Sequence, residues 1–123
     1  MDLLKKHCIP CEGGEKPFTA KQIAEYFQAL EDWYVVEDTE LVKQYKCKDF
    51  LEVLAFVNAI GAIAETEGHH PDINLFGWNK VKLTLSTHTI GGLSINDFIL
   101  AAKIDAMRKQ QFPTVSVFPV TQS

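Results

Sequence analysis

Apolar residues recur three or four positions apart in three segments of the chain, which is the pattern of helices that bury one side. The first segment predicts a helix over 20–31, and the second predicts a helix over 49–67. The third predicts a helix that begins near 95 and runs to about 108. The second pattern is the strongest of the three, because its apolar positions continue from Phe50 to Ala64.

Polar residues and a glycine mark the ends of these helices. Thr19 with Gln22, and Ser94 with Asp97, have the spacing of a capping box, in which side chain and backbone bond each other at a helix start. Gly68 follows the second helix and is the residue type that most often ends one, since it adopts a left-handed backbone readily.

Two pairs of short extended segments lie between the helices. The first pair is 33–36 and 41–47, and the second is 73–76 and 81–85, where apolar and polar residues alternate as in a half-buried strand. A polar turn separates the strands of the first pair, and a turn containing Gly77 separates those of the second. Each pair therefore predicts an antiparallel hairpin.

The order of elements, α-ββ-α-ββ-α, predicts an α+β two-layer sandwich. We expect a four-stranded antiparallel sheet with helices packed on one face, and such a sheet can leave its other face to solvent or a partner. Residues 18–110 form the domain. Residues 1–17, punctuated by proline and glycine, form an N-terminal arm, and 111–123 form a tail in which 114–118 is the candidate extended segment.

Composition narrows the functional classes. The chain has 123 residues, 46% of them apolar and 23% charged, which is typical of one globular domain. A net charge of −4 argues against a protein that binds nucleic acid phosphates. No apolar run is long enough to span a membrane, and Met1 to Pro10 lacks the apolar core of a secretory signal. We therefore expect a cytoplasmic protein.

The cysteines agree with a reducing compartment. Cys8 and Cys11 form a lone CxxC, which is weak support for zinc without a second pair. The simpler interpretation is two reduced thiols in a loose arm. Cys47 lies in a strand-like segment and is expected to be a small core residue.

Candidate chemistry concentrates in one cluster. His69, His70 and His88 fall within a twenty-residue window, with Glu65 before them and Asp97 after them. Imidazoles titrate near neutrality, so a convergent set is suited to moving protons. Structural roles compete with this interpretation. Histidines beyond a helix C-terminus interact favourably with its dipole, a carboxylate at a helix start stabilises free N–H groups, and a surface Glu is commonly solvated.

Zinc is the other use of three histidines. Adjacent histidines rarely ligate one ion, and the usual His spacing of two or four is missing, so we expect no metal. If the element ends that carry the cluster converge, they would build a pocket for a flat, polar heterocycle. Trp33 and Trp78 could line such a pocket, although core or rim positions are the simpler interpretation for both.

The cluster resembles the pterin-4a-carbinolamine dehydratases. The residues that carry the resemblance, in the family's spacing, are Glu65, His69, His70, Pro71, Trp78, His88 and Asp97. The stretch from Trp78 to His88, the following Gly92 to Ser94, Trp33 opening a strand and Lys48 to Phe50 opening a helix are also similar. The resemblance covers about 18–108, and the arm looks like an extension of bacterial-type members. Trp78 departs from the common tyrosine, and Thr89-Ile90 replaces a variable pair.

This resemblance implies an α+β fold assembled into dimers or tetramers. It implies loss of water from 4a-hydroxytetrahydropterin to give quinonoid dihydropterin, with no metal or organic cofactor. His69 and His88 would be the acid–base pair and His70 would mainly hold the pterin. Glu65 and Asp97 would orient imidazoles, and Trp33, Pro71 and Trp78 would belong to the substrate-binding region.

Two further interpretations remain open. Some family members also act as dimerisation partners of a transcription factor, so a binding module is one alternative. A role near molybdopterin metabolism, with the same pocket, is the other. In each case we expect a homodimer or homotetramer that contacts neither nucleic acid nor membrane directly.

Overall fold

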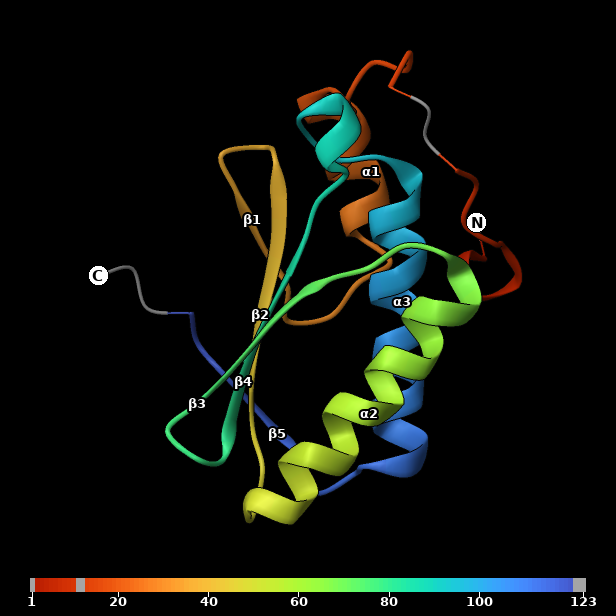
Figure 1. Ribbon diagram of the computed structural model, residues 1–123. Helices are drawn as coiled ribbons and strands as arrows, with labels where there is room; N and C mark the ends of the chain where they lie inside the picture. Colours follow the sequence, from red (N-terminus) through yellow and green to blue (C-terminus); the bar gives the residue numbers. More distant parts are fainter. Residues whose placement is uncertain (1, 11–12, 121–123) are drawn as a thin grey trace.

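The computed structural model describes residues 2–10 and 13–120 (Figure 1). Three α-helices, five strands and two short 3₁₀ turns are present in these residues. In chain order they are η1 (Leu3–Lys5), α1 (Ala20–Phe27), β1 (Tyr34–Val36), β2 (Glu40–Lys46), α2 (Phe50–Glu67), β3 (Asp72–Phe76), β4 (Lys80–Leu85), η2 (His88–Ile90), α3 (Ile95–Gln111) and β5 (Ser116–Phe118).

The sheet is antiparallel and centred on β2. Strand β4 pairs along one edge of β2, and β3 pairs with β4. Along the other edge, β1 pairs with residues 40–42 and β5 with residues 44–46. The four expected strands are thus present, and the tail adds a fifth, at the segment 114–118 singled out above. The sequence indicated that this segment is extended, and the structure shows that it pairs with β2.

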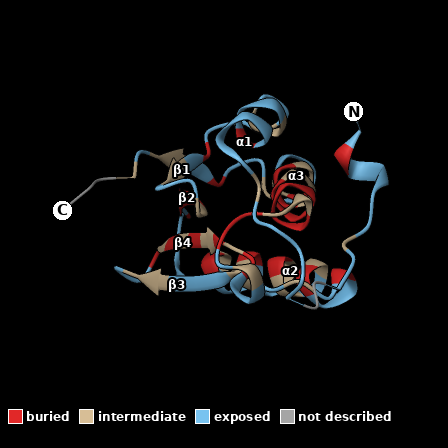
Figure 2. Cartoon of the chain, turned by 90° about the horizontal axis from the view of Figure 1, so that it is seen from above, coloured by how far each residue is buried: buried red, intermediate tan, exposed pale blue. Residues whose placement is uncertain are grey.

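The helices cover one face of the sheet, which confirms the α+β two-layer sandwich (Figure 1). Alternate residues of β2 and β4, including Tyr45 and Leu83, point toward the helices and are fully buried. Phe56 and Ile60 of α2 and Phe98 of α3 are equally buried. Helix α3 lies between α1 and α2, and buried residues surround much of its N-terminal half (Figure 2).

The cap signals are confirmed and position the candidate site. Thr19 with Gln22, and Ser94 with Asp97, form the expected capping boxes. Gly68 ends α2 with a φ of 64°, in the left-handed region. Helix α2 therefore ends at Glu67, with only Gly68 between it and His69, as the sequence predicted.

The arm is fastened to the domain, so the prediction of a loose arm is wrong. Leu3 inserts into the core, and the backbone of Cys8 and Ile9 bonds side chains of α2 and α3. One apolar anchor and a few polar contacts leave no periodic pattern, which is why the sequence did not reveal them. Cys11 lies outside the described residues. Cys47 is buried, as expected.

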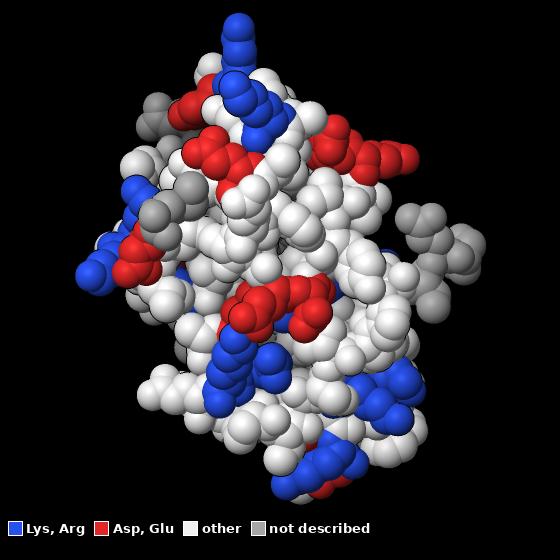
Figure 3. Space-filling model, turned by 180° about the vertical axis from the view of Figure 1, so that it is seen from behind, with Lys and Arg blue, Asp and Glu red and all other residues white. Residues whose placement is uncertain are grey.

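Charged side chains are mixed over the visible surface. Seen from behind, Lys and Arg lie beside Asp and Glu and form no continuous basic face in that view (Figure 3). Among the described residues, no helix combines the length and apolar character needed to cross a membrane.

Candidate active site

An open cavity of about 360 Å³ lies where the end of α2 meets the end of β4. All three histidines of the predicted cluster line it. The complete lining is Pro10, Gly68, His69, His70, Ser86, Thr87, His88 and Thr89. The elements therefore converge as the sequence suggested, although the histidines lie on two separate connections.

His69 is the histidine held most firmly. Its Nε2 lies 2.7 Å from Asp97 Oδ1, and the two side chains are 13% and 0% exposed. A carboxylate only accepts hydrogen bonds, so in this contact Nε2 carries the proton. In the neutral ring, Nδ1 is then the nitrogen that can accept a second proton.

Asp97 is held by the start of its own helix. Its Oδ2 accepts from the Ser94 backbone N–H at 3.0 Å and from the Thr87 hydroxyl at 2.8 Å. The Ser94 hydroxyl lies 2.8 Å from Thr87 Oγ1. Asp97 therefore has both roles that the sequence allowed. Its Oδ2 caps the start of α3, and its Oδ1 orients His69.

His70 and Glu65 make a second, different pair. Their side chains meet at 2.7 Å between Nε2 and Oε1, but both are exposed. Exposed ion pairs are screened by water and contribute little stability. This pair therefore directs the His70 ring without fixing it as firmly as Asp97 fixes His69.

His88 has no close partner among the described side chains. It lies on η2, its side chain is 76% exposed, and its Nε2 is 4.0 Å from Asp72 Oδ2. Asp72 and Thr87 were missed by the sequence analysis. Asp72 directly follows Pro71 and Thr87 directly precedes His88, and this closeness to the histidines is the hint that the sequence offers for both.

The structure does not bring every candidate to this cavity. Pro71 follows His70 and is half-buried. Trp33 is buried elsewhere, with its indole N–H bonded to Asp105. Trp78 is 61% exposed on the turn between β3 and β4, at the opposite end of β4 from His88. Within one chain, neither tryptophan lines the histidine cavity.

Metal ligation finds no support in the described part of the chain. No three His, Cys, Asp or Glu side chains there are grouped as a metal ion would require. The three histidines share a cavity, but the contacts of His69 and His70 are with carboxylates.

Residues 16–107 match the family model described as pterin 4 alpha carbinolamine dehydratase. The chain belongs to this family. A relative from Alkaliphilus metalliredigens, named "Putative pterin-4-alpha-carbinolamine dehydratase", is 46% identical over 110 residues, which are 89% of this chain and 98% of that protein. Pterin-4-alpha-carbinolamine dehydratase 2, mitochondrial, from Arabidopsis thaliana is 40% identical over 87% of this chain and 59% of its own length.

Solved structures show the same fold. A transcriptional coactivator/pterin dehydratase from Brucella melitensis superposes with a TM-score of 0.69 at 29% identity, covering 75% of this chain and 98% of that one. A pterin dehydratase-like protein identified as a RuBisCO assembly factor in the alpha-carboxysome superposes with a TM-score of 0.52 at 28% identity. The match covers 64% of this chain and 92% of that one. The family fold thus occurs in proteins described by different functions.

Proposed function

We propose that this protein dehydrates 4a-hydroxytetrahydropterin to quinonoid dihydropterin. Membership of the pterin carbinolamine dehydratase family supports the reaction. The observation that carries the mechanism is the His69–Asp97 pair, a partly exposed imidazole held by a fully buried carboxylate at the wall of a cavity.

The reaction is an elimination that needs two proton transfers. The bond between C4a and the hydroxyl oxygen breaks, and the oxygen takes a proton and leaves as water. The N5 proton is given up, and its bonding electrons form the C4a–N5 double bond. Atoms and electrons balance without an oxidant, and imidazoles can perform both transfers near neutral pH.

His69 is the candidate base and His88 the candidate acid. With Nε2–H bonded to Asp97, Nδ1 of His69 can take the N5 proton of the pterin. The Asp97 carboxylate then stabilises the imidazolium that results. His88 is exposed at the cavity and can deliver a proton to the departing hydroxyl. His70, directed by Glu65, would hold the pterin.

A dehydration assay tests this proposal. Purified protein is mixed with freshly formed 4a-hydroxytetrahydropterin, and the appearance of quinonoid dihydropterin is followed by absorbance. We expect an acceleration over the uncatalysed reaction that EDTA leaves unchanged, because no metal takes part in the proposal. No acceleration would contradict the proposed function, and activity lost with EDTA and restored by zinc would contradict the metal-free mechanism.

The physiological setting proposed is recycling of tetrahydrobiopterin in the cytoplasm. The alpha-carboxysome relative favours a second candidate, a scaffold that assists assembly of another protein. The Brucella relative is described both as a transcriptional coactivator and as a pterin dehydratase, so it favours neither candidate over the other. An assembly role does not require the buried His69–Asp97 contact. Turnover in the assay above therefore separates the first candidate from a purely non-catalytic scaffold.

We also propose self-association. The apolar residues Phe98 and Ile99 of α3 supply no surface for it, because both are buried in the core of their own chain. Leu51 and Leu54 are instead exposed at the start of α2. Trp78 is exposed on a turn whose Asn79 bonds the Cys47 backbone just before that helix, so apolar side chains gather at this end of the molecule.

Sedimentation at micromolar concentration is expected to give at least twice the 13.8 kDa mass of one chain. The double change Leu51→Lys/Leu54→Lys is expected to shift the protein to monomer, because each lysine places a charge where an apolar contact would form. Leu4→Lys, at an exposed apolar residue on η1, is the matched control. A monomeric wild type, or an unaltered oligomer in the double variant, would contradict this surface assignment.

A further inference from the structure

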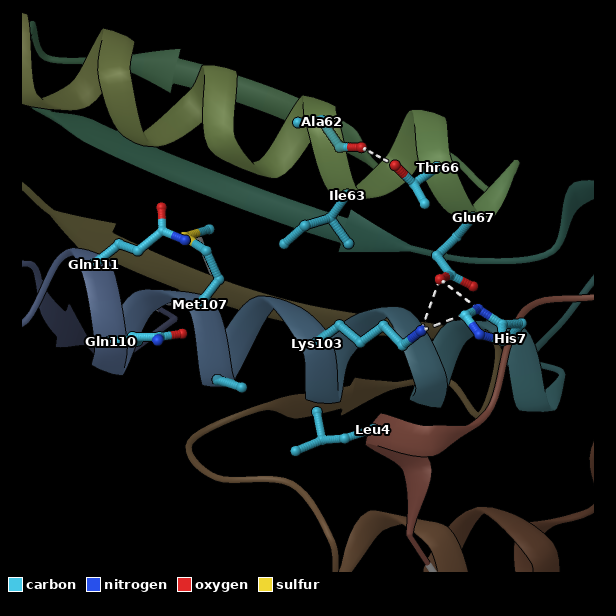
Figure 4. A pocket seen from close by; sticks show the side chains of 11 residues that line it. Leu4, His7, Ala62, Ile63, Thr66, Glu67, Lys103, Met107, Gln110 and Gln111 are labelled. Carbon is cyan, nitrogen blue, oxygen red and sulfur yellow. Dashed lines mark hydrogen bonds and ion pairs between the residues drawn. The ribbon is translucent and has the colours of Figure 1, made fainter.

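The arm crosses the outer side of the helical layer. Leu3 anchors it in the core, and η1 lies against α3 on the side that faces away from the sheet (Figure 2). Beyond η1 the chain passes between the ends of α2 and α3, where His7 meets side chains from both helices (Figure 4). The arm therefore covers part of α3 that would otherwise be exposed.

Glu67 is the first clamp on the arm. It is the last residue of α2, and its side chain is only 3% exposed. Its Oε1 accepts from the Cys8 backbone N–H at 2.8 Å, and its Oε2 lies 2.7 Å from Lys103 Nζ and 3.1 Å from His7 Nδ1. Burial raises the pKa of Glu67, but the bonds from Lys103, Cys8 and His7 together outweigh it and lower the pKa to about 2. The carboxylate is therefore charged at neutral pH.

Asn96 is the second clamp. Its Oδ1 accepts from the Ile9 N–H at 3.0 Å, and its Nδ2 donates to the Ile9 carbonyl at 2.6 Å. The Cys8 thiol donates to the Asn96 carbonyl at 3.5 Å. Burial, followed by the neighbouring Glu67 charge, raises the pKa of this thiol to about 12, so Cys8 is protonated and protected while the arm is bound.

Both clamps lie next to the catalytic candidates. Glu67 is two residues before His69, and Asn96 directly precedes Asp97. Pro10 directly follows Ile9, the residue that Asn96 holds, and forms part of the lining of the histidine cavity. Further along the arm, Pro17 packs against Gly92, four residues after His88, so closely that a Cβ added to Gly92 would lie 2.7 Å from the proline side chain.

We propose that the N-terminal arm forms one wall of the histidine cavity, and that Glu67 and Asn96 are positioning residues that act through it. They fix Cys8 and Ile9, and thereby place Pro10 beside His69 and His70. Neither residue touches substrate in this proposal. The kinetic part of the inference rests on the proposed function, whereas the structural part can be tested without any ligand.

The ligand-free test measures chemical protection. In a Cys11→Ser background, Asn96→Ala and Glu67→Ala are compared with Thr66→Ala. Thr66 lies on the same helical turn as Glu67, and the hydrogen bond of its hydroxyl within the described residues is to the Ala62 carbonyl of its own helix. Loss of a clamp should raise the rate of Cys8 alkylation and of His69 modification by diethyl pyrocarbonate at least about fivefold. Glu67→Gln should be intermediate, since its amide oxygen still accepts from Cys8.

The kinetic test separates a wall from a merely stabilising contact. If the arm shapes the cavity, KM for the hydroxypterin should rise at least about fivefold in Asn96→Ala and Glu67→Ala, with kcat changed by less than about twofold. A contact that only stabilises the fold would lower the active fraction and hence the maximal rate, without altering KM.

The outcomes are distinguishable. Unchanged Cys8 and His69 reactivity in both clamp variants would show that these residues do not hold the arm. In Asn96→Ala, which keeps the Glu67 charge beside the thiol, faster Cys8 alkylation with unchanged His69 reactivity would show that the arm is released without opening the cavity, and would also overturn the inference. If the wild type shows no turnover, the proposed function fails, but His69 reactivity still decides whether the arm is a wall.

Discussion

Replacing His69 with alanine is expected to lower dehydration turnover by at least about tenfold, since a positioned acid–base group typically contributes about 10²–10⁴-fold. The variant loses the imidazole that Asp97 orients at the cavity wall. We expect little loss of stability, because the Asp97 carboxylate keeps its bonds from Ser94 and Thr87. Steady-state kinetics and a thermal melt of the same preparation provide the measurement.

His88→Ala should show a comparable loss of turnover with even less effect on stability, because this side chain is largely exposed. Thr66→Ala, outside the cavity, is the matched control for both histidine variants. Wild-type turnover in either histidine variant would remove that histidine from the mechanism. A loss of turnover that merely follows a lower melting temperature would instead assign it a structural role.

Replacing Asp105 with alanine is expected to destabilise the fold by about 3–5 kcal/mol, the range found when one partner of a buried ion pair is removed. Lys43 is buried on the inner face of β2, and its Nζ lies 2.9 Å from Asp105 Oδ1. The variant would leave that ammonium with the Glu31 carbonyl and the faces of Trp33 and Tyr45. Urea denaturation at neutral pH measures the loss.

The double variant Lys43→Met/Asp105→Leu is the control for this prediction, because it removes both charges together. It should be clearly more stable than Asp105→Ala, since buried pairs can often be replaced by apolar residues at little cost. KM for the pterin should stay at the wild-type value in both, because neither residue lines the histidine cavity. Equal stability of single and double variants would show that the buried charge is not the cause.

The His69–Asp97 contact could be anticipated from the sequence, whereas the Lys43–Asp105 contact could not. Asp97 was recognised because its capping spacing and its place in the family motif coincide, and the structure puts it in contact with His69. Asp105 and Lys43 gave no indication of pairing. They lie 62 residues apart, and a lysine within a strand is usually solvated, so their contact depends on how α3 packs over β2.

The positions of Trp33 and Trp78 also depended on the tertiary structure. The family motif placed both in the substrate-binding region, whereas the fold buries one beside Asp105 and exposes the other at the far turn of a hairpin. A linear motif records which residues occur together, but it does not say which end of a strand each one reaches.

The sequence by itself determined the elements, their order and the fold class of this protein. Those features arise from interactions between near neighbours, such as apolar spacing, capping residues and the left-handed Gly68, which are visible in a few consecutive letters. Only the tertiary structure decided that the arm is clamped by Glu67 and Asn96, that the tail supplies a fifth strand, and that His69 is paired with a buried carboxylate. These contacts join residues from about 28 to 87 positions apart. Single polar bonds over such separations leave no periodic trace, so they exist only once the helices have packed on the sheet.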